Sequence, residues 1–246
     1  MKMNLKDKVV LITGGADGIG KDLVIESAKK GAKVVFCDIT NEKAELLKTE
    51  LSAQGYDNVF YYHCDVSSPE QVKNMFEQIK ETFGELHVLV NNAAKQTVAT
   101  WDEMTDEEFS SVIDVNLKGV YYCMKYASKI MNRGSNITNI LSVYHNKARL
   151  HKYHYDAAKG GVAQLTREGA LALGERDISV NGIYPGYVIT PMNAHEDRSK
   201  ATLKNVLKDP QIIESKNFAL SILSYIEDFS RMTTGQIFGV DAGRGL

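Results

Sequence analysis

The chain has 246 residues, 43% of them hydrophobic and 24% charged, with a formal net charge of −2. This composition is typical of a globular protein, and the near-neutral charge gives no reason to expect nucleic acid or an acidic membrane as a partner. No run approaches the ~18 apolar residues of a membrane-spanning helix, and the early apolar run VVLI is too short for a signal peptide. We therefore expect a cytoplasmic protein with no membrane partner.

Short β-branched or aromatic runs alternate with amphipathic helical stretches along the whole chain. The expected strands are residues 8–13, 33–38, 59–65, 87–93, 136–142, 179–185 and 235–241. Continuously apolar strands joined by helical connections indicate a parallel sheet covered on both faces. No linker, repeat or low-complexity tract interrupts this pattern. We therefore expect one α/β domain over residues 1–246.

Several helix boundaries are marked by local signals. Residues 21–30 are amphipathic and end in a lysine pair followed by glycine. Ser68 precedes Pro69, which favours a capped helix start, and Thr105 with Glu108 forms a capping box. A further helix is expected to start at YHYDAAKGG, residues 153–161, where Tyr155 and Lys159 lie one turn apart.

A glycine-rich loop, TGGADGIG, follows the first strand directly and leads into the first helix. Such a loop lets backbone approach a pyrophosphate at the positive end of a helix. Asp38 ends the second strand, where a carboxylate can accept hydrogen bonds from both adenosine ribose hydroxyls and repel a 2′-phosphate. The loop and this acid together predict a site for NAD, with NADP less favoured. The alternative is a tight turn followed by a solvated strand-end acid.

The Gly-x-x-x-Gly-x-Gly spacing of this loop resembles that of the short-chain dehydrogenase/reductase family, and the resemblance runs nearly end to end. It implies a single Rossmann-like, doubly wound parallel sheet of about seven strands, with a substrate lid at about residues 190–220. One departure is Ala94, which stands where the family's Asn-Asn-Ala-Gly turn has its glycine. The cofactor-binding residues that the resemblance implies are Gly14, Asp17, Gly18, Ile19, Gly20, Asp38, Asp65, Val66, Asn92, Ala93, Tyr155, Lys159, Pro185, Gly186, Val188 and Thr190.

The same resemblance implies a catalytic set of Asn116, Ser142, Tyr155 and Lys159. Tyr155 would be the acid/base, Ser142 would hold the substrate oxygen, and the backbone carbonyl of Asn116 would hold a relay water. A free tyrosine has a pKa of about 10, so we expect Lys159 to lower the pKa of Tyr155 toward working pH. Alone, a tyrosine and a lysine one turn apart would be an ordinary helix pair. Tyr153 lies outside this spacing and is expected to pack or to line a pocket.

The substrate is less defined by the sequence. Two stretches, Ser142–His145 and Thr190–Ala194, resemble the family's glucose-type sugar dehydrogenases. We therefore expect Ser142, His145, Tyr155 and Asn193 to contact substrate, with Lys95 and Gln96 as further polar candidates. Steroids, acetoin-like ketones and 3-oxoacyl thioesters stay open.

The predicted function is an NAD-dependent oxidoreductase acting on a secondary alcohol or ketone, with a sugar or polyol as a candidate substrate. The alternatives are an NADP-dependent 3-oxoacyl thioester reductase and a non-catalytic NAD-binding sensor on the same fold. The resemblance also implies a homotetramer, with a dimer as the alternative.

Neither a disulfide framework nor a metal site is expected. Cys37, Cys64 and Cys123 are widely spaced, which indicates reduced core thiols. His151 and His154 are close in sequence, but no cysteine or carboxylate cluster accompanies them.

Overall fold

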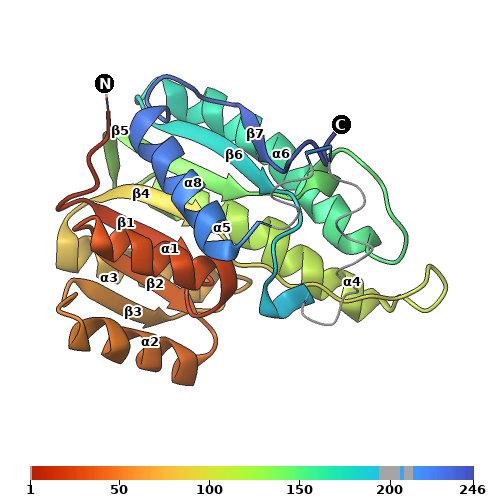
Figure 1. The fold of residues 1–246 in the computed structure, drawn as a ribbon, viewed down its shortest axis with the longest axis horizontal. Helices are drawn as coiled ribbons and strands as arrows, with labels where there is room; N and C mark the ends of the chain where they lie inside the picture. Colours follow the sequence, from red (N-terminus) through yellow and green to blue (C-terminus); the bar gives the residue numbers. More distant parts are fainter. Residues whose placement is uncertain (1, 194–205, 208–212) are drawn as a thin grey trace.

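The computed structural model describes residues 2–193, 206–207 and 213–246. Its centre is a parallel sheet of seven strands in the order β3-β2-β1-β4-β5-β6-β7, with helices on both faces (Figure 1). The strands are β1 (Val9–Thr13), β2 (Lys33–Asp38), β3 (Val59–His63), β4 (Leu86–Asn91), β5 (Met131–Ile140), β6 (Ser179–Pro185) and β7 (Ile237–Val240). All the predicted strands are present, and the predicted doubly wound fold is confirmed.

One strand boundary differs clearly from the prediction. β5 begins at Met131 rather than at residue 136, because Met131 pairs with Leu86 ahead of a register shift in β4. The intervening residues Asn132 and Arg133 are polar and exposed. Their polarity hides the early part of the strand from a pattern based on buried apolar residues.

The helices occupy the segments between the strands. They are α1 (Gly18–Lys29), α2 (Asn41–Ala53), α3 (Pro69–Phe83), α4 (Asp106–Ile113), α5 (Gly119–Ala127), α6 (Tyr153–Gly174) and α8 (Ser215–Asp228), with a π-helical turn η1 (Asp114–Lys118) and 3₁₀ turns η2 (Val143–His145) and η3 (Pro191–Asn193). The predicted caps are formed: Ser68 accepts from the amide of Gln71, and Thr105 and Glu108 make a reciprocal capping box. No helix in the described ranges is long and apolar enough to cross a membrane.

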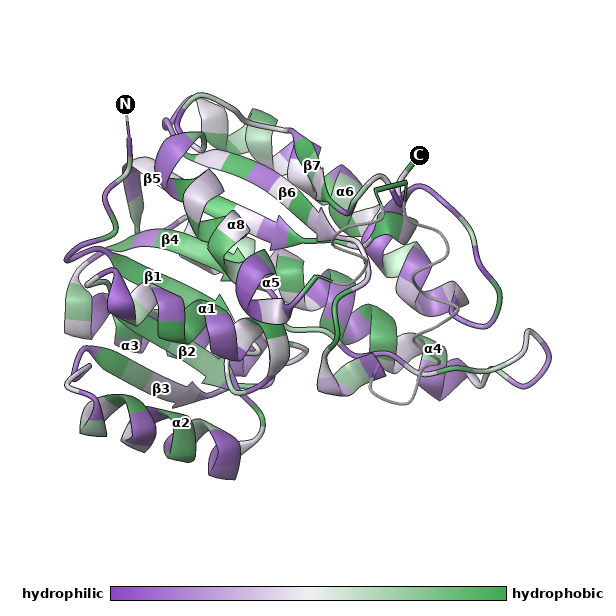
Figure 2. Cartoon of the chain, viewed as in Figure 1, coloured by the Kyte–Doolittle hydropathy of each residue, from purple (hydrophilic) through white to green (hydrophobic). Residues whose placement is uncertain are grey.

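Two apolar layers flank the sheet, because successive strand residues point to opposite faces. Val10 and Ile12 of β1 belong to the cluster that includes residues of α1 and α8, whereas Val9 and Leu11 belong to the cluster with α3, α5 and α6. Figure 2 shows hydrophobic residues along β1 and β2. Fully burying one such side chain contributes about 1.5–3 kcal/mol, so these layers hold the sheet as a rigid base for the loops at its carboxyl edge.

The strand order reverses direction between β1 and β4, which are neighbours in the sheet. In open α/β sheets the crevice at such a switch point is where ligands bind. Gly14 follows β1 and Asn92 follows β4, so the glycine loop opens into this crevice. The predicted lid at about residues 190–220 is described only at residues 190–193, at residues 206–207 and from residue 213; its remaining residues lie outside the described part of the chain.

Candidate active site

Three glycines of the glycine loop lie where a side chain would clash or would strain the backbone. Gly14 has a φ of +64°, and a Cβ there would lie 2.8 Å from the Cα of Ala93. A Cβ on Gly20 would lie 1.9 Å from the carbonyl oxygen of Gly14. Gly18 has a φ of +52°, and a Cβ there would point at Thr190 across 3.5 Å. Glycine is therefore required at these positions.

Asn92 and Thr13 lock this loop to the end of β4. The Asn92 side-chain amide donates to the carbonyl oxygens of Thr13 and Gly14, both at 3.0 Å. The Thr13 hydroxyl accepts from the backbone amides of Asn92 and Ala93, also at 3.0 Å. Asp17 caps α1 by accepting from the Gly18 amide at 2.8 Å, which is why the helix starts at Gly18 and not at residue 21. The positive end of α1 thus faces the crevice.

A cavity of about 300 Å³ lies beside this loop. Its walls are Gly14, Asp17, Gly18, Ile19, Asp38, Asn92, Ala93, Ala94, Ile140, Leu141, Tyr155, Lys159, Pro185, Thr190, Pro191 and Met192. Most of the predicted cofactor-binding residues therefore meet in one place, and backbone amides, a helix N-terminus and a strand-end acid fit the parts of a dinucleotide.

Five predicted cofactor residues do not line this cavity. Gly20 is buried in the first turn of α1. Asp65 binds the amide and hydroxyl of Ser67, and Val66 is buried against Gly119. Gly186 and Val188 instead line a second, adjoining cavity.

Asp38, in the wall of the first cavity, is held in place by the backbone. Its carboxylate accepts from the backbone amides of Ala16 at 3.1 Å and Thr40 at 2.9 Å. Lys43 lies close by and forms an ion pair with Asp17. The carboxylate of Asp38 is thereby anchored by two backbone donors where it can also accept from a bound ligand.

The second cavity, of about 450 Å³, shares Ile19, Leu141, Tyr155, Pro185, Thr190 and Met192 with the first. It is lined by both Ser142 and Tyr155. Ser142 lies just beyond β5, and its hydroxyl accepts from the amide of Tyr144 at 3.2 Å. Tyr155 lies in the first turn of α6. The predicted proton donor and the predicted oxygen-holding serine therefore face one space.

Lys159 lies one turn after Tyr155 and is buried, with only 2% of its surface exposed. Its ammonium group donates to the carbonyl oxygen of Ile140 at 2.7 Å and lies 5.6 Å from the centre of the Tyr155 ring. Burial lowers the pKa of Lys159 to about 8 because a low-dielectric setting disfavours the charged form.

The pKa of Tyr155 is shifted in the opposite direction to that predicted. Burial raises it to about 12, and Arg149 partly opposes this while Asp156 adds to it. Lys159 is not among the groups that perturb it. Within the chain itself, desolvation of the phenolate therefore outweighs the attraction of nearby cations.

Asn116 lies in the π-helical turn η1 and is fully buried. Its side-chain amide donates to the carbonyl oxygens of Lys95, at 2.7 Å, and Val112, at 2.9 Å, and its carbonyl accepts from the amide of Lys95 at 3.2 Å. The side chain therefore fixes the loop after β4. A relay through the Asn116 backbone carbonyl stays a prediction.

Of the two other predicted substrate residues, Asn193 lines the second cavity and His145 does not. The amide of Asn193 lines the second cavity, but it donates to Val188 at 2.8 Å and accepts from the amide and hydroxyl of Thr190 at 2.9 and 3.3 Å. His145 does not line that cavity; its ring packs 5.0 Å from that of Tyr184. Tyr153 packs edge-on against Trp101 at 4.8 Å, as expected for a residue outside the Tyr155–Lys159 pair.

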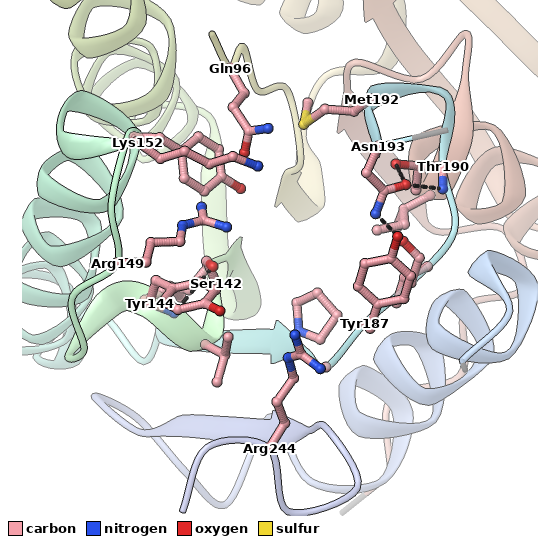
Figure 3. A pocket seen from close by; sticks show the side chains of 17 residues that line it. Gln96, Ser142, Tyr144, Arg149, Lys152, Tyr187, Thr190, Met192, Asn193 and Arg244 are labelled. Carbon is pink, nitrogen blue, oxygen red and sulfur yellow. Dashed lines mark hydrogen bonds between the residues drawn. The ribbon is translucent and has the colours of Figure 1, made fainter. Parts of the chain in front are cut away.

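Several residues of the second cavity were not predicted, chiefly Arg149, Lys152, Tyr187 and Arg244 (Figure 3). A signal for two of them exists in the sequence: a run of basic residues lies between Ser142 and Tyr155. Arg244 reaches the cavity from the turn after β7, and no local sequence pattern predicts that position.

The comparisons with known proteins agree with this geometry. Residues 8–201 match the family model described as short chain dehydrogenase. The chain belongs to the short-chain dehydrogenase family. Members of this family are oxidoreductases that use a nicotinamide cofactor to interconvert hydroxyl and keto groups on small molecules, and this short-chain dehydrogenase is such an enzyme.

Curated relatives cover the whole chain. The protein is 34% identical over 245 residues to a 3-oxoacyl-[acyl-carrier-protein] reductase of Thermotoga maritima, covering 98% of this chain and 99% of the relative. It is 36% identical over 248 residues to a 3-alpha-(or 20-beta)-hydroxysteroid dehydrogenase of Mycobacterium bovis, covering 99% and 91% respectively. Relatives with such different substrates show the family of this short-chain dehydrogenase but not its substrate.

Solved structures match this chain in fold over nearly its whole length, at lower sequence identity. A short chain dehydrogenase from Burkholderia cenocepacia in complex with NADP has a TM-score of 0.92 at 25% identity, covering 99% of this chain and 100% of that one. A blue fluorescent protein from a metagenomic library, in complex with NADPH, has a TM-score of 0.91 at 29% identity, covering 99% and 100%. The fold of this short-chain dehydrogenase is thus shared in full with cofactor-bound structures.

Proposed function

We propose that this enzyme is an NAD-dependent dehydrogenase that interconverts a secondary alcohol and a ketone. The observation that carries the proposal is the adjoining pair of cavities: Asp38 lines the first, Ser142 lines the second, and Tyr155 lines both. A bound nicotinamide cofactor would supply the hydride acceptor or donor.

The chain supplies orientation and the proton path. The hydroxyls of Ser142 and Tyr155 would hold the substrate oxygen between them, within reach for proton transfer. In alcohol oxidation the Tyr155 phenolate takes the hydroxyl proton; in ketone reduction the Tyr155 hydroxyl gives it back. Because burial raises the pKa of Tyr155 to about 12, the protonated form, which is the form that donates to a ketone, prevails at neutral pH in the chain itself.

The preference for NAD over NADP rests on Asp38. Its carboxylate is fixed by two backbone amides at the cavity wall, where a 2′-phosphate would meet a second negative charge. Asp17 adds another carboxylate to the same wall, although Lys43 pairs with it. The NADP and NADPH complexes among the similar structures concern those proteins.

Equilibrium titration with NADH and NADPH tests this choice directly. We expect NADH to bind at least about tenfold more tightly, a difference of about 1.4 kcal/mol. Asp38→Ala should reduce the difference in affinity between NADH and NADPH, because it improves NADPH binding. Asp57→Ala serves as control; Asp57 is an exposed acid that accepts from Ser52. Tighter binding of NADPH by the unaltered enzyme would overturn the proposal.

The curated relatives favour one alternative, reduction of a 3-oxoacyl thioester. Turnover of acetoacetyl-coenzyme A with NADPH, faster than any NADH-linked reaction in a broad panel of alcohols and ketones, would support it. The non-catalytic sensor predicts instead that NADH binds and nothing in the panel reacts.

We also propose a homotetramer, with a dimer as the alternative, assembled through α5 and α6. Tyr121 on α5 and Leu171 on α6 are 46% and 78% exposed, so both helices present a large apolar side chain that an interface would cover. Light scattering on the purified protein would give the mass, and Leu171→Glu should lower it if this face is the interface.

A further inference from the structure

We propose that Arg149 is a positioning residue for the reaction: it holds the turn that follows Ser142 against the turn of α6 that carries Tyr155. This inference rests on the proposed function and deepens it, because Ser142 and Tyr155 must share one substrate oxygen. The two residues belong to different elements, since Ser142 follows β5 and Tyr155 lies in the first turn of α6. Their alignment therefore depends on the contacts that join these elements.

On one side Arg149 packs on the turn after Ser142. Its guanidinium carbon lies 4.0 Å from the centre of the Tyr144 ring, which is a cation–π contact. The backbone amide of Tyr144 donates to the Ser142 hydroxyl at 3.2 Å. Figure 3 shows Ser142, Tyr144 and Arg149 on the same side of the second cavity. Arg149 thus restrains the residue whose amide orients the Ser142 hydroxyl.

On its other side Arg149 binds the first turn of α6. Its Nε donates to the two carboxylate oxygens of Asp156 at 3.2 and 3.1 Å, and its Nη2 donates to Oδ1 at 2.9 Å. The two side chains are 23% and 11% exposed, so water competes little for this ion pair. Such a two-point pairing fixes direction as well as distance. Asp156 adjoins Tyr155 in the chain, so the pairing restrains the helical turn that carries the proton donor.

The same pair sets the charge next to Tyr155. The guanidinium carbon of Arg149 lies 5.6 Å from the centre of the Tyr155 ring. Burial raises the pKa of Tyr155, Arg149 opposes that rise, and Asp156 adds to it. Loss of Arg149 would therefore release the two turns from each other and leave the Asp156 carboxylate beside the proton donor without this arginine.

The space around Arg149 allows the proposal to be tested with a small cation. Another cavity, of about 340 Å³, is lined by Tyr144, Arg149 and Asp156 among its residues. It adjoins the second cavity, because Tyr144 and Arg149 line both. Truncation of the Arg149 side chain would open a path between the two cavities, through which a guanidinium ion can reach the Asp156 carboxylate.

Chemical rescue of Arg149→Ala is the central experiment. With a neutral ketone and whichever of NADH and NADPH the unaltered enzyme prefers, we expect kcat to fall by about 10²-fold, the scale of a 1 Å misplacement of reacting groups. The KM of the ketone should change much less. Guanidinium chloride at millimolar concentration, far below the molar range in which it denatures proteins, should raise kcat by about tenfold, the scale of one hydrogen bond to a charged group. It should have no such effect when Asp156→Asn is added.

Arg133→Ala is the matched control, because Arg133 is an exposed arginine of β5 that pairs with Asp177 near the end of the strand opposite to Ser142. Its kcat should equal that of wild type, with or without guanidinium. If Arg149→Ala raises KM and leaves kcat unchanged, Arg149 only binds substrate and the positioning role is wrong. Failure of guanidinium to raise kcat in the folded Arg149→Ala variant would also overturn it.

A double variant separates positioning from stability. Removing one partner of a buried ion pair is strongly destabilising, whereas replacing both by apolar residues is often neutral. Arg149→Met combined with Asp156→Leu should therefore unfold in urea near the wild-type midpoint and still have a low kcat. Recovery of kcat together with stability would show that the pair only supports the fold.

Hydrogen exchange, which needs no turnover, separates this inference from the proposed function. Mass spectrometry would follow the backbone amides of residues 142–146 and 153–157. Both segments should exchange faster in Arg149→Ala than in wild type, and guanidinium should restore their protection. If this result is obtained while no alcohol or ketone reacts, the link between the two turns stands and the proposed function fails. Unchanged exchange in both segments would overturn the link and leave the dehydrogenase assignment intact.

Discussion

The ammonium group of Lys159 donates a hydrogen bond to the carbonyl oxygen of Ile140 over 2.7 Å. Ile140 is the last residue of β5, and Ser142 follows two positions later. This bond therefore fixes α6 against the strand that presents Ser142. Tyr155, on the same helix, is thereby held facing the cavity that Ser142 also lines.

Replacing Lys159 by methionine should remove activity yet stabilise the protein at neutral pH. The folded pKa of about 8 lies below the ordinary value of 10.5, so below pH 8 the folded state contains a buried charge, a cost of about 3 kcal/mol. Loss of the Ile140 hydrogen bond offsets about 1 kcal/mol.

The buried lysine also predicts how the difference in stability between wild type and Lys159→Met changes with pH. Between pH 8 and 10.5 the unfolded state binds more protons than the folded state, so wild-type stability gains relative to the variant as pH rises. Urea unfolding of both proteins at pH 7 and pH 10 measures the difference, and groups common to both cancel. If the free energy of unfolding of Lys159→Met exceeds that of wild type by the same amount at pH 7 and at pH 10, the burial argument is contradicted.

Tyr155→Phe should lower kcat by about 10²- to 10⁴-fold, the usual contribution of general acid–base catalysis, while NADH still binds. Tyr153→Phe is the matched control, because phenylalanine keeps the ring that packs on Trp101. Steady-state rates and NADH fluorescence titration report both properties. Comparable activity in the two variants would exclude Tyr155 as the proton donor.

Arg149 and Asp156 should move the pH profile in opposite directions. Arg149 lowers the pKa of Tyr155 and Asp156 raises it, against the larger effect of burial. Arg149→Met should therefore shift the rise of alcohol oxidation to higher pH, and Asp156→Asn should shift it to lower pH. The measurement is kcat/KM against pH with one neutral alcohol; shifts of the same sign would show that these charges do not act through Tyr155.

Asn193→Ala should weaken NADH binding more than it raises the KM of the organic substrate. The amide of Asn193 joins Thr190 to Val188, and these are residues predicted to hold the cofactor. If Asn193 contacts substrate hydroxyls instead, the KM of the substrate will rise and the dissociation constant of NADH will stay constant.

Gly14→Ala should abolish cofactor binding, because its φ of +64° disfavours a side chain and the new methyl would lie 2.8 Å from Ala93. Gly174→Ala, where nothing lies within 4 Å of the added Cβ, should leave binding unchanged. Calorimetric titration with NADH compares them. Tight binding by Gly14→Ala would show that the loop relaxes without loss.

The sequence was most informative where function depends on local pattern. The glycine loop, Asp38, and the spacing of Ser142, Tyr155 and Lys159 rest on residues near one another in the chain or at strand ends, and the structure gathers them around two adjoining cavities. The capping residues Ser68 and Thr105 act within one turn and were predicted correctly.

What the sequence did not reveal depends on tertiary packing. Arg244 reaches the cavity through the turn after β7, and His145 lies outside the second cavity with its ring against Tyr184. The pKa of Tyr155 depends on burial, and burial cannot be predicted from the spacing of residues in the sequence.

The two sides of the second cavity are attached to the protein in different ways. The side with Gln96 and Lys152 is tied across the fold: Thr97 bonds His154 at 2.7 Å, and the Ala99 amide donates to His151 at 3.3 Å. On the side with Met192, which is 38% exposed, the side-chain hydrogen bonds of Thr190 and Asn193 lie within their own turn in the part of the chain that the structure describes. Evolution or an engineer could therefore exchange Met192 for larger or smaller residues and retune substrate choice, because that side can be rebuilt without disturbing the helix that carries the proton donor.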